Sequence, residues 1–225
     1  EESRNHYNDP SKVVVTGTPV RSDFFQYTRK EARAKLGLTD DRPLVLPVWG
    51  SLGAEEMNRQ IVDFISRECA DGEPFHHIHG AGRDYQTVCQ ALKSKGVKTG
   101  ASIDVREYIY DMPVVMAAAD LVLCRAGAST ISELTAIAKP SILVPSPNVV
   151  ADHQTKNARV LEGAGGAVLL PESESSGEKL YQVAASILND KEKREAMSAA
   201  LRAMAVADAA EQIYNTLSGL LGRKK

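Results

Sequence analysis

The fold class is decided by the stretch LVLCRAGASTISEL, residues 121–134, where an apolar run meets a small-residue turn and then a helical pattern. The run 121–124 is short and wholly apolar, which is typical of a strand buried on both faces of an α/β sheet. Beyond the turn, apolar residues recur at helical spacing over 131–137, so we expect a helix that begins near Ser129 or Thr130. The stretch therefore predicts one strand–turn–helix unit of a parallel sheet.

The turn of this unit suits an anionic ligand. Gly127 and Ala128 let a ligand approach the backbone closely, and the free N–H groups of a helix N-terminus favour phosphate. Glu133, in the first turn of the expected helix, has two interpretations. In a capping box, Thr130 and Glu133 serve only the helix N-terminus, and the stretch alone favours this interpretation. In a nucleotide site, the carboxylate accepts hydrogen bonds from a ribose diol.

Composition bounds the class of protein. In 225 residues, 43% are apolar and 25% charged, which is ordinary for a soluble globular protein. The net charge of −2 gives no sign of a nucleic-acid-binding surface. The three cysteines form no C-x-x-C pair, which argues for reduced thiols in a cytoplasmic protein and against a disulfide or zinc framework. No apolar run approaches the roughly 20 residues of a membrane span, and the polar start is not a signal peptide.

Six further apolar runs have the length of buried strands and alternate with helical patterns. This alternation predicts an α/β fold with a doubly wound, mostly parallel, Rossmann-like sheet, in which ligands bind beyond the carboxyl ends of the strands. Residues 1–12 are expected to be a linker, and 13–225 one domain with helices at its C-terminal end, the second half of a longer protein. The six strands are expected at Val13–Val15, Leu44–Val48, Phe75–His79, Gly100–Glu107, Ser141–Val144 and Ala167–Leu170.

Two loops near the expected strands fit a diphosphate. Gly50–Ala54 follows a strand and precedes a helix, the arrangement that cradles phosphates, although a tight turn without ligand uses the same glycines. It is neither G-x-G-x-x-G nor a P-loop, which argues against a dehydrogenase or an NTPase. Arg21 follows the turn at Pro19. It is either a solvated surface residue, which is the more frequent case, or a forked donor to a diphosphate.

Three other features allow a structural and a functional interpretation. Tyr108 and Ile109 end a strand, where they fit either the core or a platform for a base. Residues 152–158 open a helix with polar side chains, which fits a solvated helix start or the recognition of sugar hydroxyls by amides. His77 and His79 share a strand face, but no further ligand type stands at matching spacing, so no metal site is expected.

Four runs stand in a distinctive order and spacing: TGTPVR at 16–21, GSLGA at 50–54, CRAGASTISEL at 124–134 and DHQTKNA at 152–158. Together they resemble the MurG family, the bacterial UDP-N-acetylglucosamine (UDP-GlcNAc) transferases that convert lipid I to lipid II. The resemblance runs from about Val13 to the C-terminus and covers the second half of the family's proteins. Four ordered motifs make it far more specific than any single one.

The resemblance implies the C-terminal, Rossmann-like domain of a GT-B glycosyltransferase that binds UDP-GlcNAc. It implies that Glu133 binds the ribose hydroxyls, which reverses the preference for the capping box. We expect no metal ion and no cofactor. The other positions that it implies are Arg21 and Ser51 for the diphosphate, Gly50, Gly53, Gly127 and Ala128 for the phosphate loop, the backbone of Ile109 beside Tyr108 for uracil, and Gln154 with Asn157 nearby for the GlcNAc hydroxyls.

The resemblance also implies partners and a place. The family carries its acceptor site for lipid I, its membrane-facing patch and its general base in the N-terminal domain, so no catalytic residue is assigned in this chain. We expect the chain alone to bind UDP-GlcNAc without transferring it, and the full-length protein to act at the cytoplasmic face of the bacterial inner membrane. Two alternatives stay open: another GT-B sugar-nucleotide enzyme, such as an epimerase or a natural-product glycosyltransferase, and a non-catalytic donor-binding subunit of a two-chain transferase.

Two positions depart from the family pattern. Trp49 stands where the family usually has glycine, and its bulk is able to crowd or reshape the phosphate loop. Thr155 replaces what is a second glutamine in some members, which removes one amide from the segment that contacts the sugar.

Overall fold

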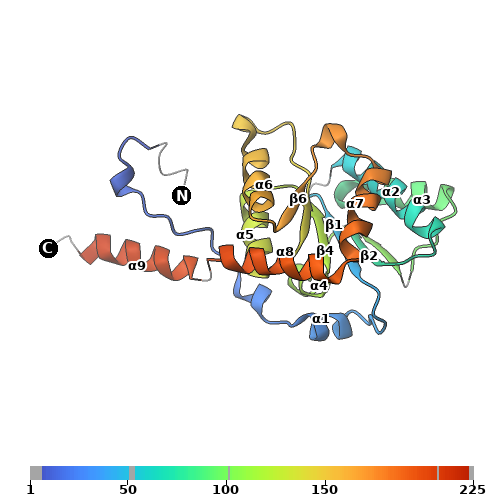
Figure 1. The fold of residues 1–225 in the computed structure, drawn as a ribbon, viewed down its shortest axis with the longest axis horizontal. Helices are drawn as coiled ribbons and strands as arrows, with labels where there is room; N and C mark the ends of the chain where they lie inside the picture. Colours follow the sequence, from blue (N-terminus) through green and yellow to red (C-terminus); the bar gives the residue numbers. More distant parts are fainter. Residues whose placement is uncertain (1–6, 51–53, 101, 207, 223–225) are drawn as a thin grey trace.

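Six parallel strands form one sheet in the part of the chain that the structure describes. The computed structural model describes residues 7–50, 54–100, 102–206 and 208–222 (Figure 1). The strand order is β3-β2-β1-β4-β5-β6, and every pairing is parallel, which confirms the predicted fold class. The strands are β1 (Leu44–Val48), β2 (His76–Gly80), β3 (Ile103–Arg106), β4 (Leu121–Cys124), β5 (Ser141–Leu143) and β6 (Ala167–Leu169).

The strand order changes direction between β1 and β4. Val45 of β1 pairs with His77 on one side and with Leu121 on the other. The chain then adds β3 beyond β2, and β5 and β6 beyond β4. Where the order reverses, the connections after the two central strands leave in opposite directions, which opens a crevice at their carboxyl ends.

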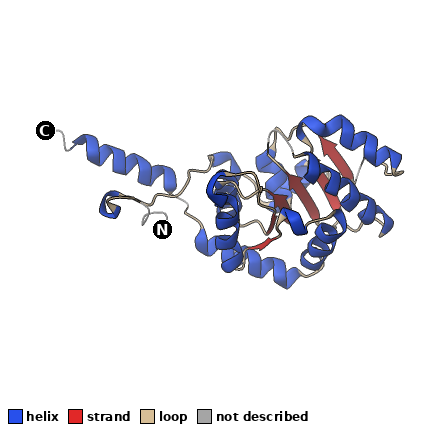
Figure 2. Cartoon of the chain, turned by 90° about the horizontal axis from the view of Figure 1, so that it is seen from above, coloured by secondary structure: helices blue, strands red, loops and turns tan. Residues whose placement is uncertain are grey.

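Helices cover both faces of the sheet (Figure 2). Because successive side chains of a strand point to opposite faces, Val45 joins the core beneath α2, α3 and α7, whereas Leu44 and Leu46 join the core beneath α1, α4, α5, α6 and α8. The α-helices are α1 (Arg29–Lys35), α2 (Glu55–Ala70), α3 (Tyr85–Ser94), α4 (Met112–Ala118), α5 (Ala128–Ala136), α6 (His153–Gly163), α7 (Gly177–Leu188), α8 (Lys191–Met204) and α9 (Ala209–Gly222). Short 3-10 helices span Pro10–Lys12, Ser22–Phe25, Gly82–Asp84, Val150–Asp152 and Glu172–Glu174.

Helix α7 begins in close contact with α2. A Cβ atom added at Gly177 would lie 2.4 Å from the Cβ of Asp63 and 2.5 Å from the backbone oxygen of Gln60. One turn later, Tyr181 packs edge-on against Phe64, with ring centres 5.4 Å apart. The absence of a side chain at Gly177 therefore sets how closely the two helices approach.

The predicted strand at Val13–Val15 is wrong. The segment is irregular, and the side chains of Val14 and Val15 are exposed. β-branched residues favour extended backbone, but a strand also needs a partner with free N–H and C=O groups. The segment runs outside the sheet (Figure 1), so its valines have no such partner.

Helix α9 projects away from the sheet beside the N-terminal segment (Figures 1 and 2). The two segments meet at Gly17, where an added Cβ would lie 3.2 Å from the Cβ of Val206 and 3.6 Å from that of Ala209. Within the described ranges, no helix is both long and apolar enough to cross a membrane. Exposed apolar side chains nevertheless gather on α9, at Tyr214, Leu217, Leu220 and Leu221.

Candidate functional site

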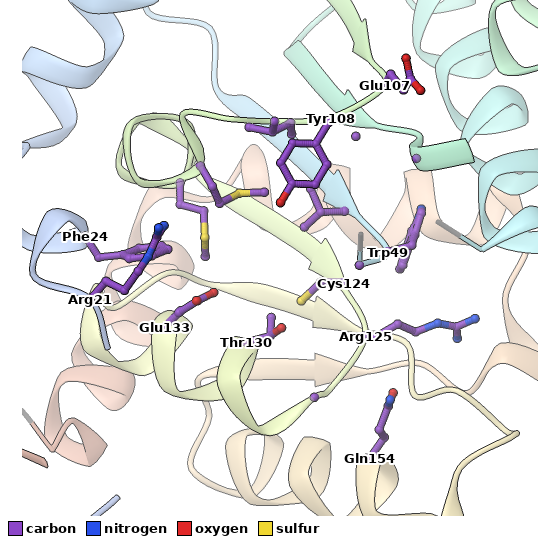
Figure 3. Close-up of a pocket in the computed structure, with 18 residues that line it drawn as sticks. Arg21, Phe24, Trp49, Glu107, Tyr108, Cys124, Arg125, Thr130, Glu133 and Gln154 are labelled. Carbon is purple, nitrogen blue, oxygen red and sulfur yellow. The ribbon is translucent and has the colours of Figure 1, made fainter. Parts of the chain in front are cut away.

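A crevice of about 550 Å³ opens at the carboxyl ends of the central strands, where the strand order reverses (Figure 3). The loops after β1, β2, β3 and β4 line it, together with the segment before α1 and the first turn of α6. Sequence reasoning expected a ligand site at this edge of the sheet, and the structure brings seven of the proposed residues together there. They are Arg21, Gly50, Tyr108, Ile109, Gly127, Glu133 and Gln154.

Arg21, Phe24 and Glu133 form one side of the crevice (Figure 3). The guanidinium carbon of Arg21 lies 5.4 Å from the centre of the Phe24 ring. Burial raises the pKa of the Glu133 carboxyl, the charge of Arg21 lowers it, and that of Asp23 raises it. Among the described residues, none donates a hydrogen bond to this carboxylate. Glu133 therefore faces the crevice as a partly buried acceptor with free lone pairs.

The capping interpretation of Glu133 is wrong. Helix α5 begins at Ala128, earlier than the sequence predicted, with Gly127 as its N-cap and no side-chain cap. The backbone N–H of Ile131 donates to the oxygen of Gly127 over 2.9 Å, so Thr130 already lies inside the helix. A residue inside the helix cannot cap it, and Glu133 is free to serve another role. Its ribose-binding role stays a prediction.

Tyr108 and Ile109 differ in burial, one fitting an exposed platform and the other the core. Ile109 is buried and Tyr108 is half exposed, with its ring centre 4.8 Å from that of Tyr110. Gly80, at the end of β2, makes room for this turn, because a Cβ there would lie 3.2 Å from the Cδ1 of Ile109. The crevice thus has an apolar floor with an aromatic ring above it.

Trp49 and Arg125 stand opposite Arg21 and Phe24 (Figure 3). The guanidinium carbon of Arg125 lies 6.0 Å from the centre of the indole ring, and the indole is buried in the core beneath α2 and α7. Arg125 donates to the backbone oxygens of Val144 (3.1 Å) and Pro145 (3.2 Å), and its Nη1 lies 2.5 Å from the Oε2 of Glu172. Arg125 therefore connects the ends of β4, β5 and β6. Sequence reasoning treated Trp49 only as a departure and missed Arg125.

The loop after β1 requires glycine at one position. Gly50 has a left-handed backbone, with φ of +87°, whereas Trp49 has no positive φ. Tryptophan at position 49 is thus compatible with the backbone there. Ser51 and Gly53, the other loop residues that the sequence singled out, lie outside the described residues. Ala128 forms the first turn of α5 but does not line the crevice.

Gln154 and Asn157 differ in position. Gln154 lines the crevice, and its Oε1 accepts a hydrogen bond from the backbone N–H of Ser146 over 2.9 Å. Asn157 does not line it; its Nδ2 donates to the backbone oxygen of Ala126 over 3.0 Å. Thr155 borders a separate cavity. Asn157 therefore fastens α6 to the turn after β4, whereas the amide N–H groups of Gln154 donate to none of the residues that the structure describes.

Several residues of the crevice carried no signal as site residues. Met112, Met116 and Thr130 line it, yet in the sequence they belong to ordinary helical patterns, and Phe24 lines it from a short segment before α1 that carries no motif. Cys124 lines it too, but burial, followed by the charge of Glu133, raises the pKa of its thiol to about 12. The thiol is thus neutral near pH 7, which excludes it as a nucleophile there.

The two strand histidines contact helix α2. His77 Nδ1 lies 3.1 Å from the Oε2 of Glu68, and His79 lies 3.1 Å from both the oxygen of Pro47 and the Oδ1 of Asn58. In the described ranges, no group of three or more His, Cys, Asp or Glu side chains is placed to hold a metal ion.

The family follows from comparison with known proteins. The model of the glycosyltransferase family 28 C-terminal domain matches residues 44–213. The chain belongs to this glycosyltransferase family. Among curated relatives of this family 28 domain, a UDP-N-acetylglucosamine–N-acetylmuramyl-(pentapeptide) pyrophosphoryl-undecaprenol N-acetylglucosamine transferase of Acetivibrio thermocellus is 40% identical over 225 residues, all of this chain and 60% of the relative. A transferase of the same name from Thermoanaerobacter sp. is 36% identical over 220 residues, 98% of this chain and 60% of the relative.

Solved structures agree with this family 28 assignment. The crystal structure of Acinetobacter baumannii MurG has a TM-score of 0.74 at 25% identity, covering 93% of this chain and 58% of that one. UDP-GlcNAc 2-epimerase from Neisseria meningitidis, solved with UDP-GlcNAc bound, has a TM-score of 0.67 at 14% identity, covering 97% of this chain and 59% of that one. The epimerase shows a shared fold alone. The resemblance to the MurG family is thus confirmed, and the chain spans about 60% of the length of the curated relatives.

Proposed function

We propose that the chain is the donor-binding half of an N-acetylglucosaminyltransferase that converts lipid I to lipid II in peptidoglycan synthesis. The observation that carries the proposal is the 40% identity, over the whole chain, to a relative that bears this transferase name. A crevice at the reversal of the strand order, where nucleotides bind in such sheets, supports it. The names of the curated relatives favour this function over an epimerase, a natural-product glycosyltransferase or a non-catalytic subunit.

In this proposal the nucleoside lies in the crevice, between the side formed by Arg21, Phe24 and Glu133 and the side formed by Trp49 and Arg125. Uracil contacts the backbone of Ile109 beside Tyr108, and the ribose hydroxyls donate to Glu133. The diphosphate lies at Arg21, Ser51 and the turns of Gly50, Gly53, Gly127 and Ala128. Gln154 contacts the GlcNAc hydroxyls, with Asn157 behind it. Residues 13–225 form this domain, and 1–12 are a linker.

The proposed reaction is an inverting transfer, in which the muramyl hydroxyl of lipid I attacks the anomeric carbon and UDP leaves. Negative charge accumulates on the departing diphosphate, so the N–H groups at the start of α5 and the Arg21 guanidinium stabilise the transition state. The acceptor site, the general base and the membrane contact are expected in the N-terminal part of the relatives. We place the full-length protein at the cytoplasmic face of the inner membrane.

Calorimetric titration with UDP and UDP-GlcNAc tests the donor site. We expect saturable binding of both ligands and no transfer to lipid I by the chain alone. Loss of two hydrogen bonds to the ribose should make Glu133→Ala bind UDP about tenfold or more weakly. Glu192→Ala, which removes a carboxylate from α8 outside the crevice, should leave UDP affinity unchanged. Absence of heat at millimolar ligand, with the chain folded, would refute the proposal.

A further inference from the structure

A second cavity, of about 400 Å³, lies at the opposite edge of the sheet from the crevice. Asp120 immediately precedes β4, and Lys139 and Pro140 precede β5, so the cavity is at the amino ends of these strands. One face of α8 closes it, with residues in each successive turn of the helix: Lys191, Arg194 with Glu195, Ser198 and Arg202. No residue that lines this cavity lines the crevice.

Positive charge predominates in this cavity. Five of its lining residues are cations and two are carboxylates, and they come from α1, the turn before β4, the turn before β5, and α8. The cations are Arg29, Lys139, Lys191, Arg194 and Arg202, and the carboxylates are Asp120 and Glu195.

The two carboxylates do not balance these cations. Asp120 accepts from Arg29 Nε (2.8 Å) and Nη2 (2.9 Å) and from the backbone N–H of Leu44 (2.9 Å), and Arg33 Nη1 lies 3.7 Å from its Oδ2, so its charge is already matched by Arg29 and Arg33. Glu195 lies 3.7 Å from Lys191, and both side chains are largely exposed, which makes the pair weak. Within the part of the chain that the structure describes, Lys139, Arg194 and Arg202 have no carboxylate within 4.0 Å.

Two of these cations are held in position by helix ends. Lys139 Nζ donates to the backbone oxygens of Ala117 (2.6 Å) and Ala119 (2.9 Å) at the end of α4. Arg194 Nη1 donates to the backbone oxygens of Ile187 and Leu188 at the end of α7. An ammonium has three N–H donors and a guanidinium five, so both groups keep donors for a ligand. The cations are thus fixed before any anion arrives.

The cations that line this cavity repel one another. Burial lowers the pKa of Lys139 to about 8, Asp120 opposes this effect, and Arg29 and Arg202 add to it. An anion placed among these three cations would remove their repulsion. Arg and Lys side chains, with the hydroxyl of Ser198, are the donors that recognise phosphate oxygens.

We propose that this cavity is a second anion-binding site, which takes a phosphate-type oxyanion bearing two or more negative charges. The ligand is either a free phosphorylated molecule or the headgroup of an anionic phospholipid, because both present the same oxygens. The site is independent of the donor crevice and does not depend on the proposed transferase activity.

The experiment is a calorimetric titration of the chain with inorganic pyrophosphate, in the presence of saturating UDP so that the crevice is occupied. We expect saturable binding that Arg202→Glu weakens about tenfold or more, as loss of a charge-assisted contact should. Lys193→Glu, on the same helix and with the same change in charge, lies outside the cavity and should change the affinity less than twofold. If UDP proves not to bind, the comparison of these two variants still localises the pyrophosphate.

A variant that is expected to bind pyrophosphate more tightly provides a second test, because misfolding cannot increase the affinity. Glu195→Gln removes a carboxylate from the cavity and should tighten pyrophosphate binding at an unchanged melting temperature. Flotation with phosphatidic acid vesicles, whose headgroup is a phosphate monoester, compared with phosphatidylcholine vesicles, identifies the source of the anion. Flotation that Arg202→Glu abolishes indicates the headgroup, and pyrophosphate binding without flotation indicates a free molecule. Absence of both, or equal losses from Arg202→Glu and Lys193→Glu, would overturn the proposal.

Discussion

Glu133 is a partly buried carboxylate that the ligand-free fold does not use. Since burial raises its pKa, the ionised form destabilises the folded chain at neutral pH. We expect Glu133→Gln to raise the melting temperature at pH 7 while it weakens UDP binding. A lower melting temperature at pH 7, with the same fold by circular dichroism, would contradict this account.

The same side chain gives a pH signature. A carboxyl whose folded pKa is raised binds more protons in the folded than in the unfolded state between its ordinary value of 4.5 and the raised value. The contribution of Glu133 to the free energy of unfolding therefore falls as the pH rises from 4.5 to the raised pKa. Below pH 4.5 the carboxyl is protonated in both the folded and the unfolded state. The advantage of Glu133→Gln over the wild type should accordingly be present at pH 7 and disappear at pH 4, as measured by thermal melts at both pH values.

Gly177 determines the packing of α7 against α2 at the scale of elements. Gly177→Ala places a Cβ against backbone atoms of α2, which cannot move without shifting the helix, and should destabilise the fold by about 1–3 kcal/mol. Gly163→Ala is the matched control, because a Cβ there meets nothing within 4 Å. It should be neutral or stabilise by up to about 1 kcal/mol. Urea unfolding of both variants measures the difference, and equal effects would refute the packing argument.

At this scale most of the fold could be predicted from the sequence. The six strands that pair in the sheet are short apolar runs between helical patterns, and their positions were predicted to within a few residues. The pattern failed at Val13–Val15, since local β propensity does not say whether a partner edge is within reach. It also misplaced the start of α5, because the N-cap is Gly127, which forms no side-chain bond that a motif could reveal.

The site was predictable only in part, for a related reason. Strand ends that carry glycine or polar residues signal a crevice, but the residues alone left two interpretations each for Arg21, Glu133 and Gln154, and only the resemblance to the MurG family made them site residues. Arg125 acts through contacts between segments far apart in the chain, such as that with Glu172. No local pattern contains such contacts.

At the scale of the whole molecule, α9 contributes little to the core. Within its described residues only Ala209 is buried, and its apolar side chains lie exposed on a helix that projects from the sheet (Figure 1). Removal of residues 210–225 should therefore change the melting temperature by about 2 °C or less. Differential scanning calorimetry of the truncated chain checks this expectation, and a large drop would show that α9 belongs to the cooperative unit.

The two cavities lie at opposite edges of the sheet and share no lining residue, so they should be energetically independent. In the double variant Glu133→Gln, Arg202→Glu, the losses of UDP and pyrophosphate affinity should equal those of the single variants. Titration of each ligand against all four chains tests additivity. A coupling beyond about 0.5 kcal/mol would mean that the sheet transmits a change from one edge to the other.

Trp49 makes the crevice visible to fluorescence spectroscopy. It is the single tryptophan of the chain, and it lies in the wall of the crevice beside Arg125. Fluorescence excited at the red edge of the indole band therefore reports on this one location, without labelling. A ligand that enters the crevice changes the charge and the solvent near the ring, and so shifts or quenches the emission. An anion that binds at the amino edge of the sheet should leave it unchanged, so one spectrum distinguishes the two sites.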